Sequence, residues 1–523
     1  MKYRIVFLVC LLCGQLLSAQ NNMVAGQVNK LALALSAIDM LYVDKVDCNE
    51  LVNSSISAMV GKLDPHSTYL TAQEVSKDRE LLTGNFGGIG IQFNIIEDTL
   101  YVQQTIVDGP SEKVGILPGD RIVMADTLNI TGKDITSEYI QSVLRGQKGT
   151  AVRLGVVRRG YSELLWFNVV RDDISVNSVD AYYMLTKKVG YISISSFSAT
   201  TARELGSVLK DFKSKGMKTL ILDLCNNGGG LLAAAVDVAS QFLLKDQLIV
   251  YTQGRAYKRM NYICREDGIF SDGQVVVLIN ENSASASEIV AGAMQDWDRA
   301  TIIGRRSFGK GLVQRPVAFD DDSELRLTIA HYYTPCGRSI QKPYGNGIDY
   351  YNDLSDRYFK GELESADSIH FSDSLKYKTL VKARTVYGGG GIMPDVFVPI
   401  DTTRTSNYYR SLTSKGIILS TIAGFMENNK DSYKKLYGNF DKFHNSFSVN
   451  KSGLMDYLET KALQAGVVKD SIMNESEMHY LEVQLKALVA RSLFTLNHYY
   501  YELNQTNPIY VKALEETGVL KTK

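Results

Sequence analysis

Four short apolar stretches alternate with helix-like segments between residues 188 and 304. The stretches are KVGYISISSF (188–197), KTLILDL (218–224), QVVVLIN (274–280) and ATIIG (300–304). The segments between them, among them residues 231–244 and 286–297, carry apolar residues at helical spacing. Nearly continuous apolar strands separated by helices are typical of a mostly parallel sheet that is buried on both faces. The sequence therefore predicts an α/β core.

The rest of the chain predicts further domains. A chain of 523 residues is too long for one hydrophobic core. Residues 84–172 contain short alternating strands, glycine turns and one helix, which is typical of a small β-rich module. We assign residues 173–400 to the α/β core, with an irregular insertion at 345–390. Residues 20–83 and 401–523 are mostly helical by their periodicity.

The first residues have the pattern of a targeting segment. Lys2 and Arg4 precede an apolar run over residues 5–17, and Leu17-Ser18-Ala19 resembles a cleavage site. The run is short for a membrane span. We predict a signal peptide over residues 1–19 and export to a bacterial periplasm, with an uncleaved N-terminal membrane anchor as the alternative.

Charge and cysteine content exclude some classes of function. Lys and Arg together number 57, as do Asp and Glu, so bulk charge gives no reason to expect nucleic acid as a partner. Four cysteines follow the targeting segment, widely spaced and without a CxxC pair, which disfavours a metal cluster. An oxidising compartment would permit a disulfide, but the sequence does not pair them.

Two strand-to-helix junctions are rich in small residues. In ILDLCNNGGGLL (221–232), three glycines allow the backbone to turn its N–H groups outward at a helix start, where they suit a negative oxygen. In VVVLINENSASASEIVAGAMQDW (275–297), a strand leads into a Ser/Ala turn where a serine can be exposed beside backbone amides. A plain turn or phosphate cradle, and simple helix caps, are the respective alternatives.

A third segment, TIIGRRSFGKGLVQRPV (301–317), nearly matches a phosphate-binding loop. Gly311 stands where a Ser or Thr would bind Mg²⁺, and Pro316 follows too soon for the required helix, so we reject nucleotide binding. A partly buried Lys310 can instead act as a general base, although most lysines lie at the surface. Of six histidines only His66 and His331 lie near these motifs, without an obvious carboxylate to orient them.

Together these stretches resemble the C-terminal processing peptidases, also called tail-specific proteases, of serine peptidase family S41. The resemblance extends over roughly residues 30–400 and includes LDPHSTYL (63–70), YYTPCGRSIQ (332–341) and GIMPDVFVP (391–399). It implies a core with the spiral sheet of ClpP and crotonase, an inserted PDZ-like domain at 84–172, and helical N- and C-terminal segments.

The resemblance also implies the site residues. Ser285 corresponds to the nucleophile and Lys310 to its general base, with Gln314 orienting the lysine. The oxyanion donors would be the backbone amides of Ala286 and Gly229, with Gly230 as the next choice. Asp296 matches an acidic position that we expect to support the site structurally. No metal or organic cofactor is implied.

The PDZ-like domain implies capture of substrate tails. Its peptide-binding loop would comprise Gly87, Gly88, Ile89, Gly90 and Ile91, and the next strand would accept the peptide by β-addition. The expected function is cleavage of proteins near their C-termini through an acyl-enzyme, with the PDZ-like domain holding the tail, gating activity, or both. The helical ends could mediate self-association or bind an adaptor.

Two positions depart from the family pattern, and two other functions stay open. Cys225 replaces a common arginine and Gly228 a frequent proline, which could alter how the site is held. The chain could be a catalytically silent PDZ scaffold, although the dyad is intact. It could also be an acyl-CoA enzyme of related architecture, although that leaves Lys310 and the PDZ-like domain unexplained.

Overall fold

The computed structural model describes residues 24–345, 347–402, 406–469 and 473–520. The predicted signal peptide, residues 1–19, lies outside these residues. The chain divides into two compact units, one formed by residues up to Val75 together with Gln314–Thr328, and the other by Ser76–Val313 and Ile329–Lys523. Residues 314–328 thus leave the predicted core segment and join the N-terminal region.

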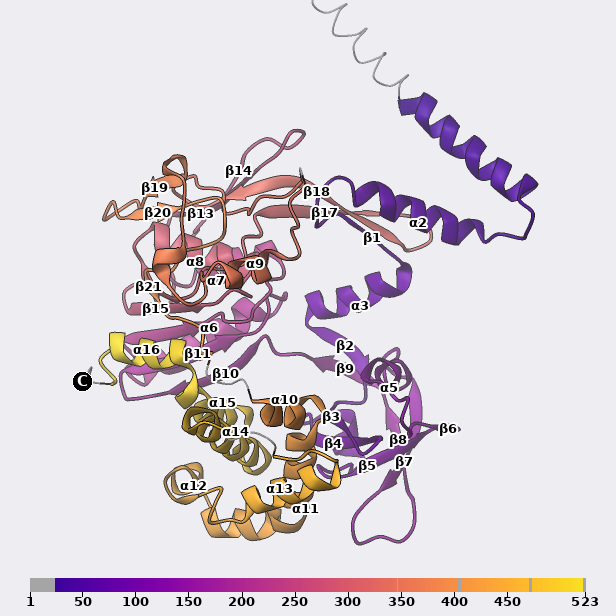
Figure 1. Cartoon of the computed structure of the whole chain (residues 1–523), viewed down its shortest axis with the longest axis vertical. Helices are drawn as coiled ribbons and strands as arrows, with labels where there is room; N and C mark the ends of the chain where they lie inside the picture. Colours follow the sequence, from indigo (N-terminus) through magenta and orange to yellow (C-terminus); the bar gives the residue numbers. More distant parts are fainter. Residues whose placement is uncertain (1–23, 346, 403–405, 470–472, 521–523) are drawn as a thin grey trace, which may run out of the picture. The chain divides into compact units, whose positions relative to one another are not determined.

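The core of the second unit is a six-stranded sheet in the order β10-β11-β12-β15-β16-β21. Figure 1 labels β10, β11, β15 and β21 of this sheet. Only β10 runs antiparallel to its neighbour. The strands are β10 (Val179–Met184), β11 (Val189–Ile194), β12 (Thr219–Asp223), β15 (Gln274–Ile279), β16 (Ala300–Gly304) and β21 (Val396–Phe397). The predicted α/β core is confirmed.

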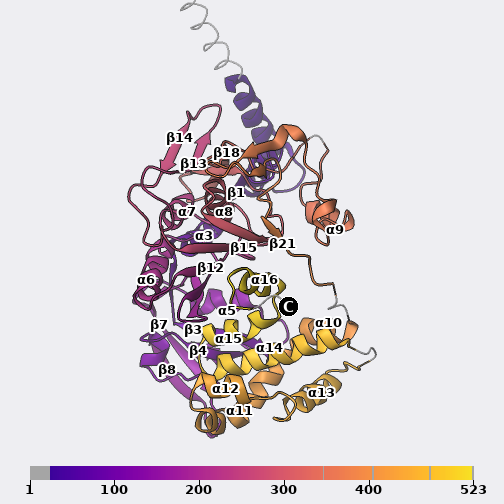
Figure 2. The ribbon, with the colours of Figure 1, turned by 90° about the vertical axis from the view of Figure 1, so that its left-hand side faces the viewer.

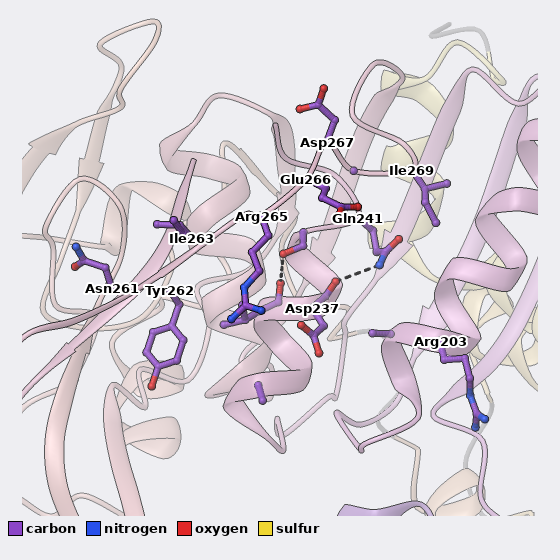
Figure 3. Close-up of a pocket in the computed structure, with 15 residues that line it drawn as sticks. Arg203, Asp237, Gln241, Asn261, Tyr262, Ile263, Arg265, Glu266, Asp267 and Ile269 are labelled. Atoms are coloured by element: carbon purple, nitrogen blue, oxygen red, sulfur yellow. Dashed lines mark hydrogen bonds between the residues drawn. The ribbon is translucent and has the colours of Figure 1, made fainter. Parts of the chain in front are cut away.

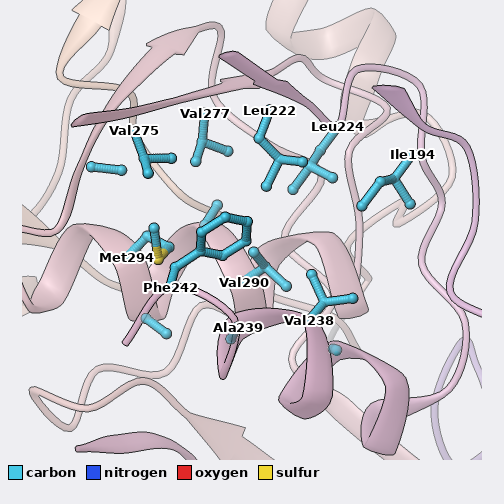
Figure 4. Close-up of a cluster of buried hydrophobic side chains, with 14 of the residues drawn as sticks. Ile194, Leu222, Leu224, Val238, Ala239, Phe242, Val275, Val277, Val290 and Met294 are labelled. Carbon is cyan, nitrogen blue, oxygen red and sulfur yellow. The ribbon is translucent and has the colours of Figure 1, made fainter. Parts of the chain in front are cut away.

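Both faces of this sheet are buried, because alternate residues of a strand point to opposite faces. On one face, Leu222, Val275 and Val277 pack with α6 (Thr201–Ser214), α7 (Leu232–Ala239) and α8 (Ala286–Asp296). Figure 4 shows Val290 and Met294 of α8, and Phe242 just after α7, facing these strands. On the other face, the alternate strand residues pack with α16 (Pro508–Glu516) near the end of the chain. Helices from distant parts of the sequence therefore complete the core.

The PDZ-like domain has its own sheet and its own hydrophobic core. The strand order is β3-β4-β5-β7-β8, with β6 paired to β5 and β3 at an edge. The elements are β3 (Ile91–Ile96), β4 (Thr99–Thr105), α4 (Pro110–Lys113), β5 (Arg121–Ala125), β6 (Leu128–Asn129), α5 (Ser137–Leu144), β7 (Ala151–Val157) and β8 (Leu165–Val170). A separate ribbon, β2 (Asn85–Gly88) with β9 (Asp172–Ser175), closes the domain where the chain enters and leaves it.

The C-terminal segment is helical, as predicted, and has a third hydrophobic core. Its long helices α11 and α14 pack together, and α13 lies along α11 (Figure 2). The helices are α10 (Asn407–Ser414), α11 (Ile417–Tyr437), α12 (Phe440–Ser446), α13 (Leu454–Gln464), α14 (Glu475–Leu493) and α15 (Leu496–Leu503). Helix α15 packs against β10, which ties this segment to the core sheet.

A second sheet was not predicted. In the second unit, β13 (Leu248–Gln253) pairs with β14 (Met260–Ile263) and with the end of β18 (Glu324–Tyr333). In the first unit, β1 (Thr68–Leu70) pairs with the start of β18. Strand β17 (Leu312–Ala318) also pairs with β18. The predicted break at residues 63–70 thus contains a strand.

The remaining elements lie in the first unit, in the insertion and near the N-terminus. The first unit contains α2 (Cys48–Val60), and α3 (Ala72–Thr83) begins in it. The insertion holds α9 (Asp353–Phe359), β19 (Lys376–Lys378) and β20 (Thr385–Tyr387). Among the described residues, one helix, over residues 24–41, is long and apolar enough to cross a membrane, and none of it is buried. A signal sequence near an N-terminus has the same properties.

Candidate active site

Two turns at the carboxyl ends of β12 and β15 are joined by hydrogen bonds. The backbone N–H of Ala284 donates to the carbonyl oxygen of Asn227 at 3.0 Å, and the hydroxyl of Ser287 donates to the same oxygen at 2.8 Å. The hydroxyl of Ser283 donates to the carbonyl oxygen of Leu224 at 2.8 Å. Neighbouring parallel strands end at the same edge of a sheet, so the two predicted junctions meet there.

These hydrogen bonds distinguish Ser285 from the two nearby serines, Ser283 and Ser287. Ser283 and Ser287 are fully buried, and each hydroxyl is used to hold the turns together. Ser285 is half-buried at the start of α8, with φ 55° and ψ −111°. A non-glycine residue in this region is strained by about 1–3 kcal/mol, and such strain is concentrated at functional sites. Of the three serines, Ser285 is the one that is partly exposed and has a strained backbone.

The carboxylate of Glu288 links the Ser285 turn to the Lys310 loop. One oxygen, Oε2, accepts the backbone N–H of Ser285 at 2.8 Å and that of Lys310 at 2.9 Å. The other, Oε1, accepts the N–H of Gly309 at 2.7 Å and the hydroxyl of Ser307 at 2.5 Å. Glu288 is fully buried. Its burial raises the pKa to about 7, against these hydrogen bonds, which favour the ionised form.

Tyr332 makes a second link between the same segments. Its single O–H proton is shared between the carbonyl oxygen of Ser285, at 3.1 Å, and that of Lys310. Burial raises the pKa of Tyr332 well above its usual value, so it remains a donor. Lys310 itself is half-buried. Glu288 and Tyr332 therefore hold the backbones of the predicted nucleophile and base against each other.

The oxyanion donors have different surroundings. No acceptor among the described residues takes the N–H of Ala286, as expected at the first position of a helix. The N–H of Gly229 donates to Oδ1 of Asn227 at 2.8 Å, so an oxyanion role for this amide requires that bond to break. Gly229 has φ 105° and Gly230 has φ 146°, a region open to glycine.

A second lysine lies beside the same loop. Lys342 donates its backbone N–H to the carbonyl oxygen of Gly309 at 2.9 Å, and burial lowers the pKa of its ammonium group. That group is 3.1 Å from Oδ2 of Asp353, donates to the carbonyl oxygen of Tyr350 at 3.2 Å, and lies over the ring of Phe308. Lys342 is thus held as a structural cation.

Gln314 belongs to the unit formed by residues up to Val75 and Gln314–Thr328. There its side-chain amide donates to Oγ1 of Thr328 at 3.2 Å, and that hydroxyl donates to Oδ1 of Asp64 at 3.0 Å. Hydrogen bonds from Ser67 and His66 help to lower the pKa of Asp64 despite its partial burial. The role of Gln314 in orienting Lys310 stays a prediction.

Asp296 lies at the opposite end of α8 from Ser285. Its carboxylate is 2.8 Å from the Arg338 guanidinium, with both side chains fully buried, and it accepts the backbone N–H of Cys336 at 3.0 Å. Eleven residues of helix place it about 16 Å along the axis from Ser285. This position is consistent with a structural role. Cys225, whose side chain is half-buried, and the three other described cysteines are free thiols.

Four of the five predicted PDZ residues line one cavity. Gly88, Ile89, Gly90 and Ile91 border a cavity of about 400 Å³ between β3 and α5. Gly87 does not line it, because its Cα faces the carbonyl oxygen of Gly146, which a β-carbon would approach to 2.1 Å. Gly87 therefore shapes the loop from behind.

Another cavity, of about 860 Å³, contains none of the predicted site residues (Figure 3). It lies between α6, α7 and residues 261–269. Charges of both signs border it, among them Arg203, Arg265 and Asp237, and within it Gln241 donates to the carbonyl oxygen of Asp237 at 3.3 Å. This mixture of charges does not indicate a reaction.

Sequence reasoning missed Glu288 and Tyr332. Glu288 could have been found, since a serine followed three residues later by glutamate is a capping-box pattern. Tyr332 gives no such signal, because 47 residues separate it from Ser285.

Three family models match the chain: peptidase family S41 over residues 188–350, a PDZ domain over 87–169, and a family of unknown function over 408–495. A carboxy-terminal-processing protease of Bartonella bacilliformis is 40% identical over 308 residues, which cover 57% of this chain and 69% of that protein. A probable CtpA-like serine protease of Staphylococcus epidermidis is 30% identical over 460 residues, covering 88% and 87%. The carboxy-terminal processing protease CtpA of Bacillus subtilis is 33% identical over 319 residues, covering 61% and 67%.

Proposed function

This chain belongs to peptidase family S41, and we propose that Ser285 and Lys310 form the catalytic dyad with which it cleaves proteins near their C-termini. The chain is a serine peptidase that carries a PDZ domain. The domain limits that we propose are those predicted above, with Gln314–Thr328 joined to the N-terminal region.

The observation that carries the dyad is the shared carboxylate of Glu288. It accepts the backbone N–H groups of Ser285 and Lys310 through one oxygen, at 2.8 and 2.9 Å. Two residues whose N–H groups share one acceptor atom must have adjacent backbones, although 25 positions separate them in the sequence. This adjacency supports a reaction between their side chains.

The reaction is acyl transfer. Lys310, in its uncharged form, takes the proton of the Ser285 hydroxyl while the serine oxygen attacks the substrate carbonyl. The negative charge on the carbonyl oxygen is stabilised by the N–H of Ala286, and by that of Gly229 once it leaves Asn227. The amine product departs with the proton, and water then hydrolyses the acyl-enzyme. Gln314 orients Lys310, while Asp296 holds the far end of α8.

The PDZ domain supplies the preference for tails. An open edge strand beside a glycine-containing loop can accept a peptide as an added strand and hold its terminal carboxylate. Protein substrates are therefore the partners, bound through their C-termini. We assign self-association or adaptor binding to the helical ends, and at the N-terminal one Leu31, Leu33 and Leu41 are exposed apolar side chains.

The site of action is outside the cytoplasm. The apolar helix over residues 24–41 and the targeting pattern before it support export, either with cleavage or with retention of an N-terminal anchor. A periplasmic enzyme of this kind meets exported proteins as its substrates.

The test is cleavage of an unstructured protein with an apolar tail by the purified chain lacking residues 1–19. We expect Ser285→Ala and Lys310→Ala each to lower kcat by about 10³-fold or more. Ser214→Ala and Lys213→Ala, at the end of α6, are matched controls that should cleave normally. Normal cleavage by either dyad variant would disprove the assignment.

A further inference from the structure

The PDZ cavity has a shape and a lining that suit an extended peptide. Strand β3 is at the edge of its sheet, and α5 borders the other side of the cavity. Phe86, Ile89, Ile91, Phe93 and Leu144 give it an apolar lining. The edge strand can pair with an added strand while the lining takes apolar side chains.

One end of this cavity has backbone donors without acceptors. Ile89 and Gly90 are buried, and within the described residues no acceptor takes their N–H groups. A buried unpaired amide is costly, and such groups are usually satisfied by a ligand or water. A terminal carboxylate fits this end of the cavity.

A residue of the C-terminal helices also lines the cavity. Arg491, in the last turn of α14, donates from its guanidinium to Oε1 of Gln92 on β3 at 3.2 Å. Its guanidinium carbon is 5.8 Å from the centre of the Tyr499 ring. The PDZ domain and the C-terminal helices therefore build this wall of the cavity together.

The C-terminal helices are held on the PDZ domain at two further points. Lys461 of α13 is 3.1 Å from Oε1 of Glu97, and Arg159 donates to the carbonyl oxygen of Glu427 on α11. Neither Lys461 nor Arg159 lines the cavity. The position of Arg491 is thus supported by contacts independent of its own.

The two arginines of the cavity differ in how their charges are balanced. Arg145 is 2.6 Å from Oε2 of Glu80 and stacks on the Phe86 ring at 4.3 Å. Arg491 is half-buried, and it forms no ion pair within the part of the chain that the structure describes. Burial lowers its pKa from the usual value, and the nearby carboxylate of Asp180 offsets only part of this effect. An anionic group of a ligand would offset that cost.

The register of an added strand decides which group meets Arg491. With the terminal carboxylate at the amides of Ile89 and Gly90, the last residue of an antiparallel peptide lies opposite Ile91, and the penultimate residue lies opposite Gln92. Residues directly opposite each other in antiparallel strands point to the same face of the sheet. The penultimate side chain therefore points toward the face where Arg491 contacts Gln92.

We propose that Arg491 is a specificity residue that recognises an acidic side chain at the penultimate position of the substrate tail. The inference rests on the proposed capture of tails by the PDZ domain, and it assigns part of the tail-binding site to the C-terminal helices. The geometry that carries it is the Arg491–Gln92 contact beside the open edge of β3.

Peptide binding to the full chain carrying Ser285→Ala tests the proposal without the need for turnover. Fluorescent ten-residue peptides would share one apolar last residue and differ only in a penultimate Glu or Gln, with affinity read by anisotropy. We expect the Glu peptide to bind roughly fivefold more tightly. Arg491→Ala should abolish this difference, and it should weaken binding of the Glu peptide more than binding of the Gln peptide. Arg491→Glu should reverse it, so that a penultimate Lys is preferred over Gln.

The controls separate the possible failures. Arg159→Ala removes a positive charge from the same domain contact, and it should keep the fivefold preference. A C-terminally amidated peptide should bind poorly to every variant. Equal weakening of both peptides by Arg491→Ala would show that Arg491 binds the terminal carboxylate. An unchanged preference for the Glu peptide would show that Arg491 binds neither the terminal carboxylate nor the penultimate side chain. Either result would overturn the proposal. Failure of every tail peptide to bind would overturn tail capture as well, whereas cleavage of the peptides, seen by mass spectrometry, would overturn the dyad alone.

Discussion

Gly229 lies directly against the side chain of Ser285. A β-carbon added to Gly229 would come within 2.8 Å of Cβ of Ser285 and within 3.0 Å of the N–H nitrogen of Ala286. The same residue has φ 105°, which side chains rarely adopt. The turn after β12 therefore requires glycine at position 229, where it contacts the proposed nucleophile.

Gly229→Ala should therefore impair catalysis. We expect kcat to fall by about 10²-fold or more, because the methyl group displaces Ser285 and the Ala286 amide from their positions. Gly228→Ala is the matched control, since a β-carbon there meets nothing within 4 Å. The assay is tail-peptide cleavage, with PDZ binding measured in parallel and expected to be unchanged. Equal activity of the two variants would contradict this account of the turn.

Glu288→Gln should lower kcat by about 10²-fold with little effect on tail affinity. The amide keeps the shape of the carboxylate but offers one acceptor oxygen, so it cannot serve the N–H donors of Ser285, Gly309 and Lys310 together. Steady-state kinetics and anisotropy would measure the two quantities. A variant in which affinity falls and kcat does not would show that Glu288 acts on substrate capture instead.

Titration of Glu288 should appear in the pH dependence of activity. Its pKa is raised from 4.5 to about 7 by burial. As the pH falls through about 7, protonation turns one acceptor oxygen into a donor and loosens the contact with Ser285 or Lys310, so kcat/KM should fall. The fall with a midpoint near pH 7 that belongs to Glu288 should be absent from Glu288→Gln, which keeps only the fall caused by protonation of Lys310. Persistence of the fall near pH 7 in that variant would assign it to another group.

Titration of Glu288 should change the stability of the chain in the opposite direction to its activity. The folded chain binds the Glu288 proton more tightly than the unfolded chain does, because the folded pKa is the higher one. The contribution of Glu288 to the free energy of unfolding is therefore full below about pH 4.5 and is lost as the pH rises to about 7. Urea unfolding of wild type and Glu288→Gln at several pH values would measure it. A difference between the two chains that does not change with pH would contradict this.

Asp296→Ala should destabilise the core by about 3–5 kcal/mol, because it leaves the buried Arg338 guanidinium without its carboxylate. Denaturant unfolding would measure the loss. The folded fraction should retain cleavage activity, since Asp296 is remote from Ser285 along α8. Combining the change with Arg338→Ala should cost less than the sum of the two single changes.

The sequence predicted the elements of the core well. The apolar stretch 300–304 matches β16, and the stretch 274–280 contains β15 with one extra residue. Local apolar patterns determine where such buried strands begin and end. The pairing of β1 with β18 joins residues more than 250 positions apart, and no local pattern reports it.

For the proposed site, the sequence motifs pointed to Ser285 and Lys310 but gave no reason for their backbones to be adjacent. That adjacency depends on Glu288 and on Tyr332, and the distance of Tyr332 along the chain gives no periodic signal. Arg491 was unpredictable for the same reason, since its neighbour Gln92 precedes it by 399 residues. Long-range contacts arise from packing of whole domains rather than from propensity.

Helix α16 has a consequence for biosynthesis. It covers the face of the core sheet that carries Ile221, Val276 and Leu278, using Ile509, Tyr510 and Leu514. These helix residues follow the strands that they cover by more than 200 positions, so synthesis from the N-terminus leaves this face of the sheet exposed until α16 has also been made. The apolar side chains of the sheet are therefore open to water or to a chaperone during that interval.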